Sequence, residues 1–457
     1  MAYFKSPYVQ VVYYSHRDYL HMDLKRRADF PSLPPELWIC IFHHATHVPG
    51  PLIPGIYAHA SLIGPIYHRA CSIDLREALI TKRALVRVCK KWWHLAIPYL
   101  YQSVYIGRAR CLSSLSSALM HSAAGRGTIV SARPLGEYTQ RLDIAIRDHA
   151  VNADTDSAWL AAVITHMPHL AIVSFTIATN YTGADLPNNI LDALHYSAAS
   201  LRVLDWSSTP LEPSASRIMD LLTKCTQLRI LNCPRLVWSR ELDHGGIPPT
   251  LTTLRLHAII PVQIAATYNH LLPNFDPNTV CRPGPTALQE LILDLNRDPY
   301  HWEDLLRVYS SQLVSVQFYI PSILPINVED HMELLTRVCP GLRRLTITSE
   351  RFSSFIRPNR LVFPSITYLG LRATRTQSKK PDFEMLFAFL EELRSSVPSL
   401  QAVQLLNECN LQCLLNTHTK FVVRALQPFM EATPFRVEDK EGVLLTGLRC
   451  SVSGGRT

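Results

Sequence analysis

One short pattern, Leu-x-x-Leu-x-Leu with other apolar residues allowed at its fixed positions, returns along most of this chain. Successive copies are separated by about 29 residues on average. The first residues of nine copies are Leu170, Leu201, Leu228, Leu251, Leu288, Leu313, Leu342, Ile366 and Leu400. Two weaker copies end at Ile106 and Ile144. A unit of this length cannot bury its apolar residues alone, so the copies must stack on one another and share one core.

The segments between the copies have the pattern of amphipathic helices, each stopping at a proline or a small polar turn before the next copy. The clearest are residues 158–164, 216–222, 332–338 and 383–393. This alternation predicts an α/β fold of short parallel strands with helices on the outer face. It resembles an irregular leucine-rich-repeat solenoid. The asparagine expected three residues after the last core residue is mostly missing, for instance at Thr209 and Leu236, so irregular turns are expected. A generic α/β domain with chance matches is the alternative, and nine copies preceded by helix stops argue against it.

The front of the chain has a different, helical pattern in two segments, residues 33–42 and 85–92. Pro34 and Pro35 suit the first turn of a helix, with Ser32 as a possible cap. Leu37, Ile41 and Ala45 then recur every fourth residue, and residues 85–96 repeat the arrangement. Helices this short need a partner to be stable, so the two are expected to pack together.

These two segments, Leu-Pro-x-Glu-Leu-x-x-x-Ile-Phe followed by Leu-x-x-Val-Cys-Lys-x-Trp, resemble the F-box, over residues 31–48 and 75–105. Residues 49–74 separate the halves and read as an inserted loop, an arrangement similar to that in F-box-like proteins of mushroom-forming fungi. The resemblance implies docking on a Skp-family adaptor and, through it, on a cullin. The adaptor-binding set that it implies is Leu33, Pro34, Leu37, Ile41, Phe42, Val88 and Trp92. Some of these must instead hold the two helices together, and sequence does not divide them.

The expected organisation has four parts. Residues 1–30 form a loosely ordered lead-in, and residues 31–105 form the helical module. Residues 106–434 form the solenoid, with surface loops expected at 261–287 and 372–382. Residues 435–457 form a cap, expected as a hairpin, and a tail.

Composition limits the class of protein. The net charge of +8 is mild and spread along the chain, which argues against a nucleic-acid partner. The odd count of 11 cysteines has no paired spacing, so a reducing compartment, cytoplasmic or nuclear, is expected. No apolar run approaches the ~18 residues of a membrane span, so no membrane partner is expected.

The candidate motifs for catalysis and metal binding have plainer interpretations. His43 and His47 lie one helical turn apart, but no third ligand follows nearby, so solvent-facing histidines are favoured and no metal is predicted. Serine-hydrolase, zinc-protease and phosphate-loop motifs are absent, so no cofactor, no catalytic residue and no enzymatic activity are predicted. Basic residues at 343–344 and 372–375 are expected to be exposed strand-edge charge, with a binding face as the less favoured alternative.

The resemblance implies a substrate-receptor subunit of a Skp–cullin–F-box E3 ubiquitin ligase, in which the solenoid binds a target protein and other subunits transfer ubiquitin. The alternative is a leucine-rich-repeat interaction scaffold outside any ubiquitin ligase, with the helical module serving only as a cap. Adaptor binding separates the two.

Overall fold

The structure is a computed structural model. It describes residues 33–445 except 51, 54–64, 127–132, 147–152, 177–185, 207–210, 212, 234–247, 258–286, 296–301, 321–327, 353–362, 376–378, 418–423, 425–433 and 441. The expected lead-in over 1–30, the cap at Ser32, nearly all of the loop at 261–287 and the tail beyond 445 lie outside these residues.

Three helices form the front of the chain: α1 (Pro35–Thr46), α3 (Pro65–Val88) and α4 (Lys90–Gln102). Pro34 is the N-cap of α1, and its carbonyl accepts hydrogen bonds from the backbone N–H groups of Leu37, at 3.1 Å, and Trp38, at 3.3 Å. Pro35 occupies the first helical position, where a missing N–H leaves no bond unmade. The loop expected over 49–74 is wrong from Pro65 onward, because residues 65–74 are already part of α3.

The second F-box-like segment is split between two helices at Cys89, where one continuous helix was expected. Cys89 is extended, with φ −162° and ψ 169°, and its Sγ accepts a hydrogen bond from the backbone N–H of Trp92 at 3.5 Å. Cys89 therefore ends α3 and caps α4. Helix α4 then continues through Pro98 to Gln102, within the helical module expected up to residue 105.

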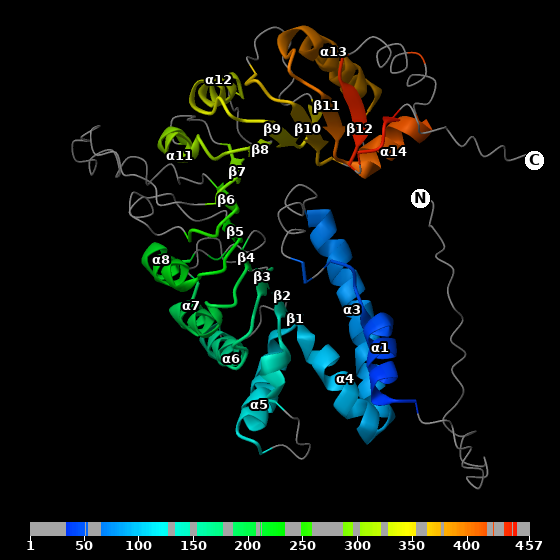
Figure 1. Ribbon diagram of the computed structural model, residues 1–457, viewed down its shortest axis with the longest axis vertical. Helices are drawn as coiled ribbons and strands as arrows, with labels where there is room; N and C mark the ends of the chain where they lie inside the picture. The colour runs from blue at the N-terminus through cyan, green and yellow to red at the C-terminus, as the bar shows by residue number, and fades with distance from the viewer. Residues whose placement is uncertain are drawn as a thin grey trace, which may run out of the picture.

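The described residues also form a single twelve-stranded sheet whose strands lie in sequence order and are all parallel (Figure 1). The first six strands are β1 (Ser103–Ile106), β2 (Arg141–Ile144), β3 (Ile172–Phe175), β4 (Val203–Asp205), β5 (Ile230–Cys233) and β6 (Thr253–His257). The others are β7 (Glu290–Asp294), β8 (Ser315–Ile320), β9 (Arg344–Ser349), β10 (Tyr368–Ala373), β11 (Ala402–Leu405) and β12 (Arg436–Asp439). Each of the nine predicted copies, and both weaker ones, is confirmed as a strand of this α/β fold.

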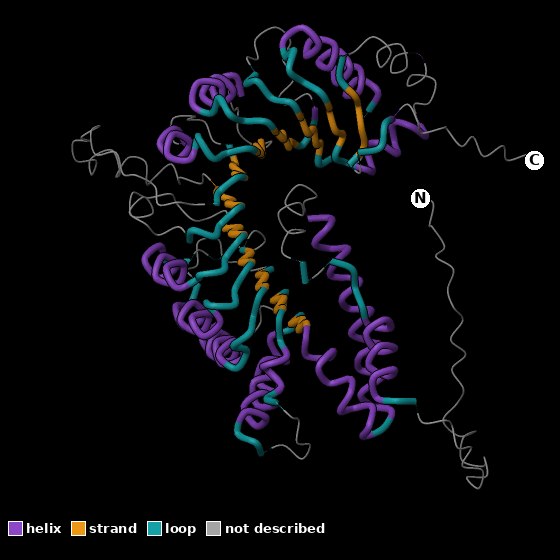
Figure 2. Tube along the Cα trace, viewed as in Figure 1, coloured by secondary structure: helices purple, strands orange, loops and turns teal. Residues whose placement is uncertain are grey.

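Most of the remaining helices lie along the outer side of the curved sheet, and the strands line its inner, concave side (Figures 1 and 2). The α-helices after α4 are α5 (Leu112–Ala123), α6 (Ala153–Thr165), α7 (Asn188–Leu194), α8 (Ala215–Lys224), α11 (Glu303–Tyr309), α12 (Val328–Val338), α13 (Lys380–Ser396) and α14 (Glu408–Thr417). Short 3-10 turns occur at Ala109–Cys111, Leu135–Tyr138 and His195–Ser197. The four helices predicted between the copies are confirmed as α6, α8, α12 and α13.

One continuous apolar core lies between the sheet and the outer helices. Every strand contributes its second position to this core, from Val104 in β1 to Val437 in β12. Neighbouring repeats stack directly, as the rings of Phe175 and Trp206 show, with centroids 4.7 Å apart and planes 6° from parallel. Because each layer is covered by the next, no single repeat has a closed core of its own.

Both predicted borders of the solenoid shift outward, since the sheet begins at Ser103 and reaches Asp439 rather than running from 106 to 434. The predicted terminal hairpin is confirmed: Glu438 forms an antiparallel bridge with Leu444, across a turn in which Gly442 has φ +82°. The surface loop expected at 372–382 is wrong at both ends, because Arg372 and Ala373 belong to β10 and α13 begins at Lys380.

Candidate functional site

An aromatic seam joins α1 to α4 at the front of the molecule. The ring of Trp92 lies 4.7 Å from that of Trp38 and 4.9 Å from that of Phe42, measured between centroids. Phe42 is completely buried. The hydroxyl of Tyr99 also donates a hydrogen bond to the carbonyl of Ile39 at 3.2 Å. Of the seven predicted adaptor-binding residues, Phe42 and Trp92 therefore pack the helices against each other.

Three other members of the predicted set are exposed apolar side chains. Leu37 is 48% exposed, Ile41 is 45% exposed, and Val88 at the end of α3 is 58% exposed. Pro34 is exposed as well, and Leu33 is partly buried. Three exposed apolar residues of the same module were not in the predicted set: Ile39 in α1, Ile53 after α1 and Ile80 in α3. We call Leu37, Ile39, Ile41, Ile80 and Val88 the front apolar residues.

The three histidines of α1 and its C-cap, His43, His44 and His47, are exposed. The rings of His43 and His47 lie 5.1 Å apart between centroids. In the part of the chain that the structure describes, no group of three or more His, Cys, Asp or Glu side chains is placed to hold a metal ion.

The concave face of the sheet is the second candidate site. Because side chains alternate between the two faces of a strand, the positions between the core residues point to the concave side. The strand register aligns them in three rows. The first row contains Val203, Ile230, Thr253, Glu290, Ser315, Arg344 and Tyr368; the second contains Asp205, Asn232, Arg255, Ile292, Gln317, Thr346, Gly370 and Gln404; the third contains His257, Asp294, Tyr319, Thr348 and Arg372. The first row is apolar in β3, β4 and β5, where Ile172, Val203 and Ile230 form a buried cluster, and from β6 to β10 the three rows are mostly polar.

Charged side chains meet in the third row. Arg255 reaches across from the second row, and its Nη2 lies 3.6 Å from Oδ1 of Asp294. Tyr319, on the next strand, is close enough to Asp294, Arg255, Glu350 and Arg372 for their charges to act on it, and burial is the main cause that raises its pKa. Arg372 is 4% exposed, and burial together with the like charge of Arg255 lowers its pKa to about 10. The interpretation of Arg372 as exposed edge charge is therefore wrong.

The first row has a second group of contacts. The Arg344 guanidinium carbon lies 4.3 Å from the centroid of the Tyr368 ring, a cation–π contact. The Tyr368 hydroxyl donates a hydrogen bond to the side-chain oxygen of Gln404, and burial raises the Tyr368 pKa to about 12. The Thr253 hydroxyl donates to Glu290 at 3.3 Å, but burial dominates and raises the Glu290 pKa to about 7. Arg344 is thus also on the concave face, not at an exposed edge.

Several buried polar atoms of the second row have no hydrogen-bond partner. They are Oδ1 of Asn232, Nε of Arg255, Oε1 of Gln317 and Oγ1 of Thr346. A buried polar atom without a partner typically costs about 1–3 kcal/mol, so native chains seldom keep several of them together without a reason. These four atoms come from β5, β6, β8 and β9, and therefore lie across the centre of the sheet.

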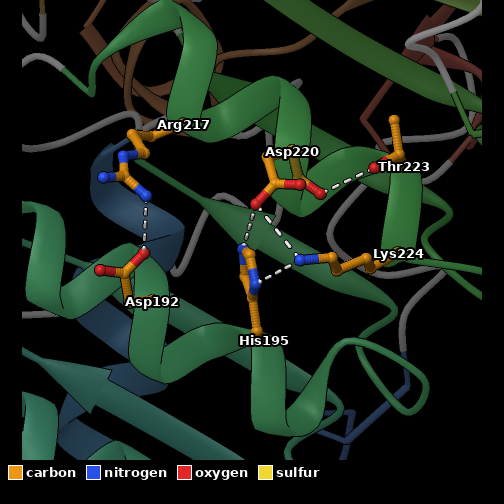
Figure 3. A network of polar contacts seen from close by, with 6 residues as sticks. All are labelled: Asp192, His195, Arg217, Asp220, Thr223 and Lys224. Carbon is orange, nitrogen blue, oxygen red and sulfur yellow. Dashed lines mark hydrogen bonds and ion pairs between the residues drawn. The ribbon is translucent and has the colours of Figure 1, made fainter.

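A further polar network, on the outer face, joins α7 to α8 (Figure 3). Nζ of Lys224 lies 2.9 Å from Nδ1 of His195 and 3.2 Å from Oδ2 of Asp220. Nη1 of Arg217 lies 3.4 Å from Oδ1 of Asp192. Most of these side chains are about half exposed, and exposed ion pairs contribute at most about 1 kcal/mol each. We interpret this network as a contact between neighbouring repeats.

Comparison of the sequence with protein-family models gives no match, and comparison with curated proteins gives none either. Among the described helices, none has the length and apolar character needed to cross a membrane. The functional conclusions below therefore follow from the two candidate sites themselves.

Sequence reasoning found the front apolar residues in part and missed the polar concave centre. Ile39 and Ile80 are not at fixed positions of the F-box-like motif, so the motif did not mark them. The concave residues had a usable signal, because polar residues recur between the two core leucines of successive copies, as in Leu254-Arg255-Leu256 and Val316-Gln317-Phe318. The contacts among these residues depend on the strand register, and the sequence alone does not give that register.

Proposed function

We propose that this chain is a substrate-receptor subunit of a Skp–cullin–F-box ubiquitin ligase. The front helices dock on a Skp-family adaptor, and the concave face of the solenoid binds a target protein. The observation that carries the proposal is the separation within the front module: the buried seam of Trp38, Phe42 and Trp92 holds the helices, while Leu37, Ile41 and Val88 remain exposed. Apolar side chains left exposed beside a completed core mark a protein-binding surface.

The mechanism is positioning. The adaptor and cullin bring the ubiquitin-transferring subunits close to the target, and this chain holds the target, so it supplies no catalytic group and no cofactor. Eight cysteines, at positions 40, 89, 111, 225, 233, 339, 409 and 413, are free thiols, which suits the cytoplasm or nucleus, where such ligases work.

Co-purification with a Skp-family adaptor tests the docking half of the proposal. The double variant Leu37→Asp with Ile41→Asp places two charges on the apolar face of α1. Because central interface residues typically contribute about 2 kcal/mol or more, we expect adaptor affinity to fall at least about 30-fold. Met120→Asp is the matched control, since Met120 in α5 is similarly exposed but lies outside the front module. Equal adaptor capture by the wild type and the double variant would refute the proposed docking face.

Phe42→Ala serves as a second comparison. Removing a fully buried ring typically lowers the free energy of unfolding by about 3–5 kcal/mol. We expect it to loosen α1, detected as faster hydrogen exchange of the α1 amides, whereas Leu37→Asp and Ile41→Asp leave that exchange unchanged. Faster exchange in the double variant as well would mean that its effect on the adaptor is indirect.

One observation favours the alternative of a scaffold with a helical end cap. Helix α4 runs directly into β1, and the carbonyl of Gln102 accepts a hydrogen bond from the backbone N–H of Gln140 at 3.0 Å. The guanidinium carbon of Arg76 in α3 also lies 6.0 Å from the ring centroid of Tyr105 in β1. The module therefore covers the first edge of the sheet. A folded chain that binds no Skp-family adaptor would select this alternative.

A further inference from the structure

We propose that a basic surface built by α3, α4 and the segment around α5 binds the phosphate backbone of a nucleic acid, independently of its base sequence. This inference goes beyond the proposed function, because neither adaptor docking nor target binding requires it. It draws on three features: a long stretch without carboxylates, exposed cations without ion pairs, and their placement on one packed unit.

The positive charge of the chain is concentrated in one stretch. Residues 78–136 contain nine Lys and Arg residues and no Asp or Glu, so they carry a formal charge of +9. The rest of the chain contains 36 basic and 37 acidic residues, and is therefore close to neutral. The expectation that the net charge of +8 is spread along the chain is wrong, and it no longer argues against a nucleic-acid partner.

Eight of these nine cations are exposed, and Lys82 alone is buried. The exposed ones, which we call the 78–136 cations, are Arg83, Arg87, Lys90, Lys91, Arg108, Arg110, Arg126 and Arg133. With the residues that the structure describes, none of the eight forms an ion pair. Cations on the outer helices are paired instead, as Arg217 is with Asp192 at 3.4 Å. This surface is therefore open and positive, with no carboxylate of its own stretch to balance it.

Four of the 78–136 cations surround the joint between α3 and α4. Arg83 and Arg87 are one helical turn apart on α3, so they lie on the same face. Lys90 and Lys91 occupy the first turn of α4, which contains no acidic residue. Both arrangements are unfavourable in the free chain, because like charges repel and the start of a helix already carries partial positive charge. A bound anion relieves both.

The other four cations flank α5. Arg108 and Arg110 precede its first residue, and Arg126 follows its last turn. Arg133 is held near the same end of the helix, because two residues later a backbone N–H donates to Oγ of Ser122, in the last turn of α5, at 3.0 Å. Both ends of α5 are therefore positive.

The two groups of cations belong to one packed unit. The 3-10 turn Leu135–Tyr138 packs against both α4 and α5, and α4 packs against α3. These helices lie together at one end of the molecule (Figure 1). Helix α4, whose 13 residues span about 20 Å at ~1.5 Å per residue, separates the joint from the strand that leads to α5. An anion that contacts both groups must therefore be long.

A nucleic acid meets this requirement. Double-stranded DNA carries one negative charge per ~1.7 Å of its axis, so about 12 phosphates lie along 20 Å. Six of the eight exposed cations are arginines, whose guanidinium fork matches the oxygens of a phosphate. Binding to a membrane also draws on apolar side chains that insert beside the cations. Among the described residues of 108–133, Met120 is the only large apolar side chain that is exposed, which favours a nucleic acid.

Fluorescence anisotropy with the full chain, purified without any adaptor, tests the inference. The probes are two fluorescein-labelled DNA duplexes of about 20 base pairs and unrelated sequence. If at least four cations contact phosphates, the affinity for both duplexes falls about 100-fold or more between about 50 and 200 mM salt. Absence of binding at about 50 mM salt, an affinity that does not change with salt, or a strong preference for one duplex would overturn the proposal.

Competition separates a nucleic acid from other polyanions. The competitors are polyglutamate of the same total charge and vesicles that contain phosphatidylserine. We expect each to displace the labelled duplex at least about tenfold less effectively than unlabelled duplex does. A competitor that displaces it equally well would assign the surface to an acidic protein or to a membrane, and would overturn the proposal.

Two double variants locate the surface. Arg83→Gln with Arg87→Gln removes two cations at the joint, and Arg126→Gln with Arg133→Gln removes two at the end of α5. Each double variant should weaken duplex binding about tenfold at about 50 mM salt. Each should also lower the slope of log affinity against log salt by about two, because each lost phosphate contact lowers it by about one.

Arg217→Gln with Lys224→Gln is the matched control. It removes two exposed cations from α8 that are already paired with aspartates, so duplex binding and the salt slope should stay unchanged. An equal loss in this control would mean that net charge alone decides binding, and would overturn the site. Unchanged binding in both test variants would overturn it as well. Because no adaptor is present, none of these results bears on adaptor docking.

Discussion

At the scale of single residues, Glu290 shows how the concave face changes the chemistry of a side chain. Burial acts against ionisation and raises its pKa from the ordinary 4.5 to about 7, although the Thr253 hydroxyl and the positive charge of Arg344 act in the opposite direction. Desolvation outweighs both because the carboxylate loses most of its contact with water. Glu290 therefore ionises close to neutral pH, and the charge of the first row changes there.

This gives a pH prediction for stability. Between pH 4.5 and about 7 the folded chain keeps a proton on Glu290 that the unfolded chain releases, so the free energy of unfolding falls as the pH rises through this window. Glu290→Gln imitates the protonated carboxyl and removes this contribution. We expect the melting temperature of the variant to match that of the wild type near pH 4.5 and to exceed it above pH 7. If the melting temperatures of the two proteins differ by the same amount at every pH across the window, the raised pKa of Glu290 is contradicted.

At the scale of elements, the joints between helices and strands decide which side chains meet. Cys89 interrupts the segment from Leu85 to Ala96, so Val88 ends one helix and remains exposed, while Trp92 begins the next and joins the aromatic seam. Farther on, two asparagines tie α14 to β10: Nδ2 of both Asn407 and Asn410 donates to the carbonyl of Ala373. This link between repeats partly replaces the asparagine series that the sequence lacks.

A close approach between elements gives the second prediction. Gly136, in the 3-10 turn Leu135–Tyr138, lies so near the end of α6 that a Cβ there would come within 1.8 Å of the carbonyl oxygen of His166. Gly136→Ala forces this backbone contact apart and should lower the free energy of unfolding by roughly 1–3 kcal/mol or more. Gly341→Ala is the matched control, because a Cβ at Gly341 meets nothing within 4 Å. Urea denaturation followed by circular dichroism measures both, and equal midpoints would contradict the expectation.

At the scale of the whole molecule, the chain is a stack in which each layer depends on its neighbours. The two ends of the sheet are closed differently. The helical module covers β1, while the hairpin of β12 and the residues up to Leu445 cover β11. An uncovered edge would present unpaired backbone groups and apolar side chains to other chains.

Removing the C-terminal hairpin tests whether the sheet needs a cover at β11. A chain ending at residue 433 lacks β12 together with the buried side chains of Phe435 and Val437. We expect a lower melting temperature and a free energy of unfolding smaller by about 2–5 kcal/mol. We also expect aggregation through the exposed edge of β11. A chain ending at residue 445 keeps the hairpin and should behave as the full chain does. Calorimetry with light scattering distinguishes them, and identical behaviour would show that the hairpin is dispensable.

The sequence by itself determined the strands, their order along the chain and most of the helices between them. Alternation and helical periodicity are local properties, set by residues two to four positions apart, and these are the distances over which a single sequence is informative. The period of about 29 residues then implied stacking, since no unit of that size closes its own core. Even the weak copies ending at Ile106 and Ile144 became strands.

Only the tertiary structure decided which side chains meet. Trp38 and Trp92 are far apart in sequence but lie 4.7 Å apart in the seam, which divides the packing residues of the F-box-like motif from its exposed ones. Arg255 and Asp294 come from neighbouring strands, and their contact at 3.6 Å depends on the register of those strands. The physical reason is that such contacts are fixed by packing over long sequence separations, for which the local pattern of residues provides no signal.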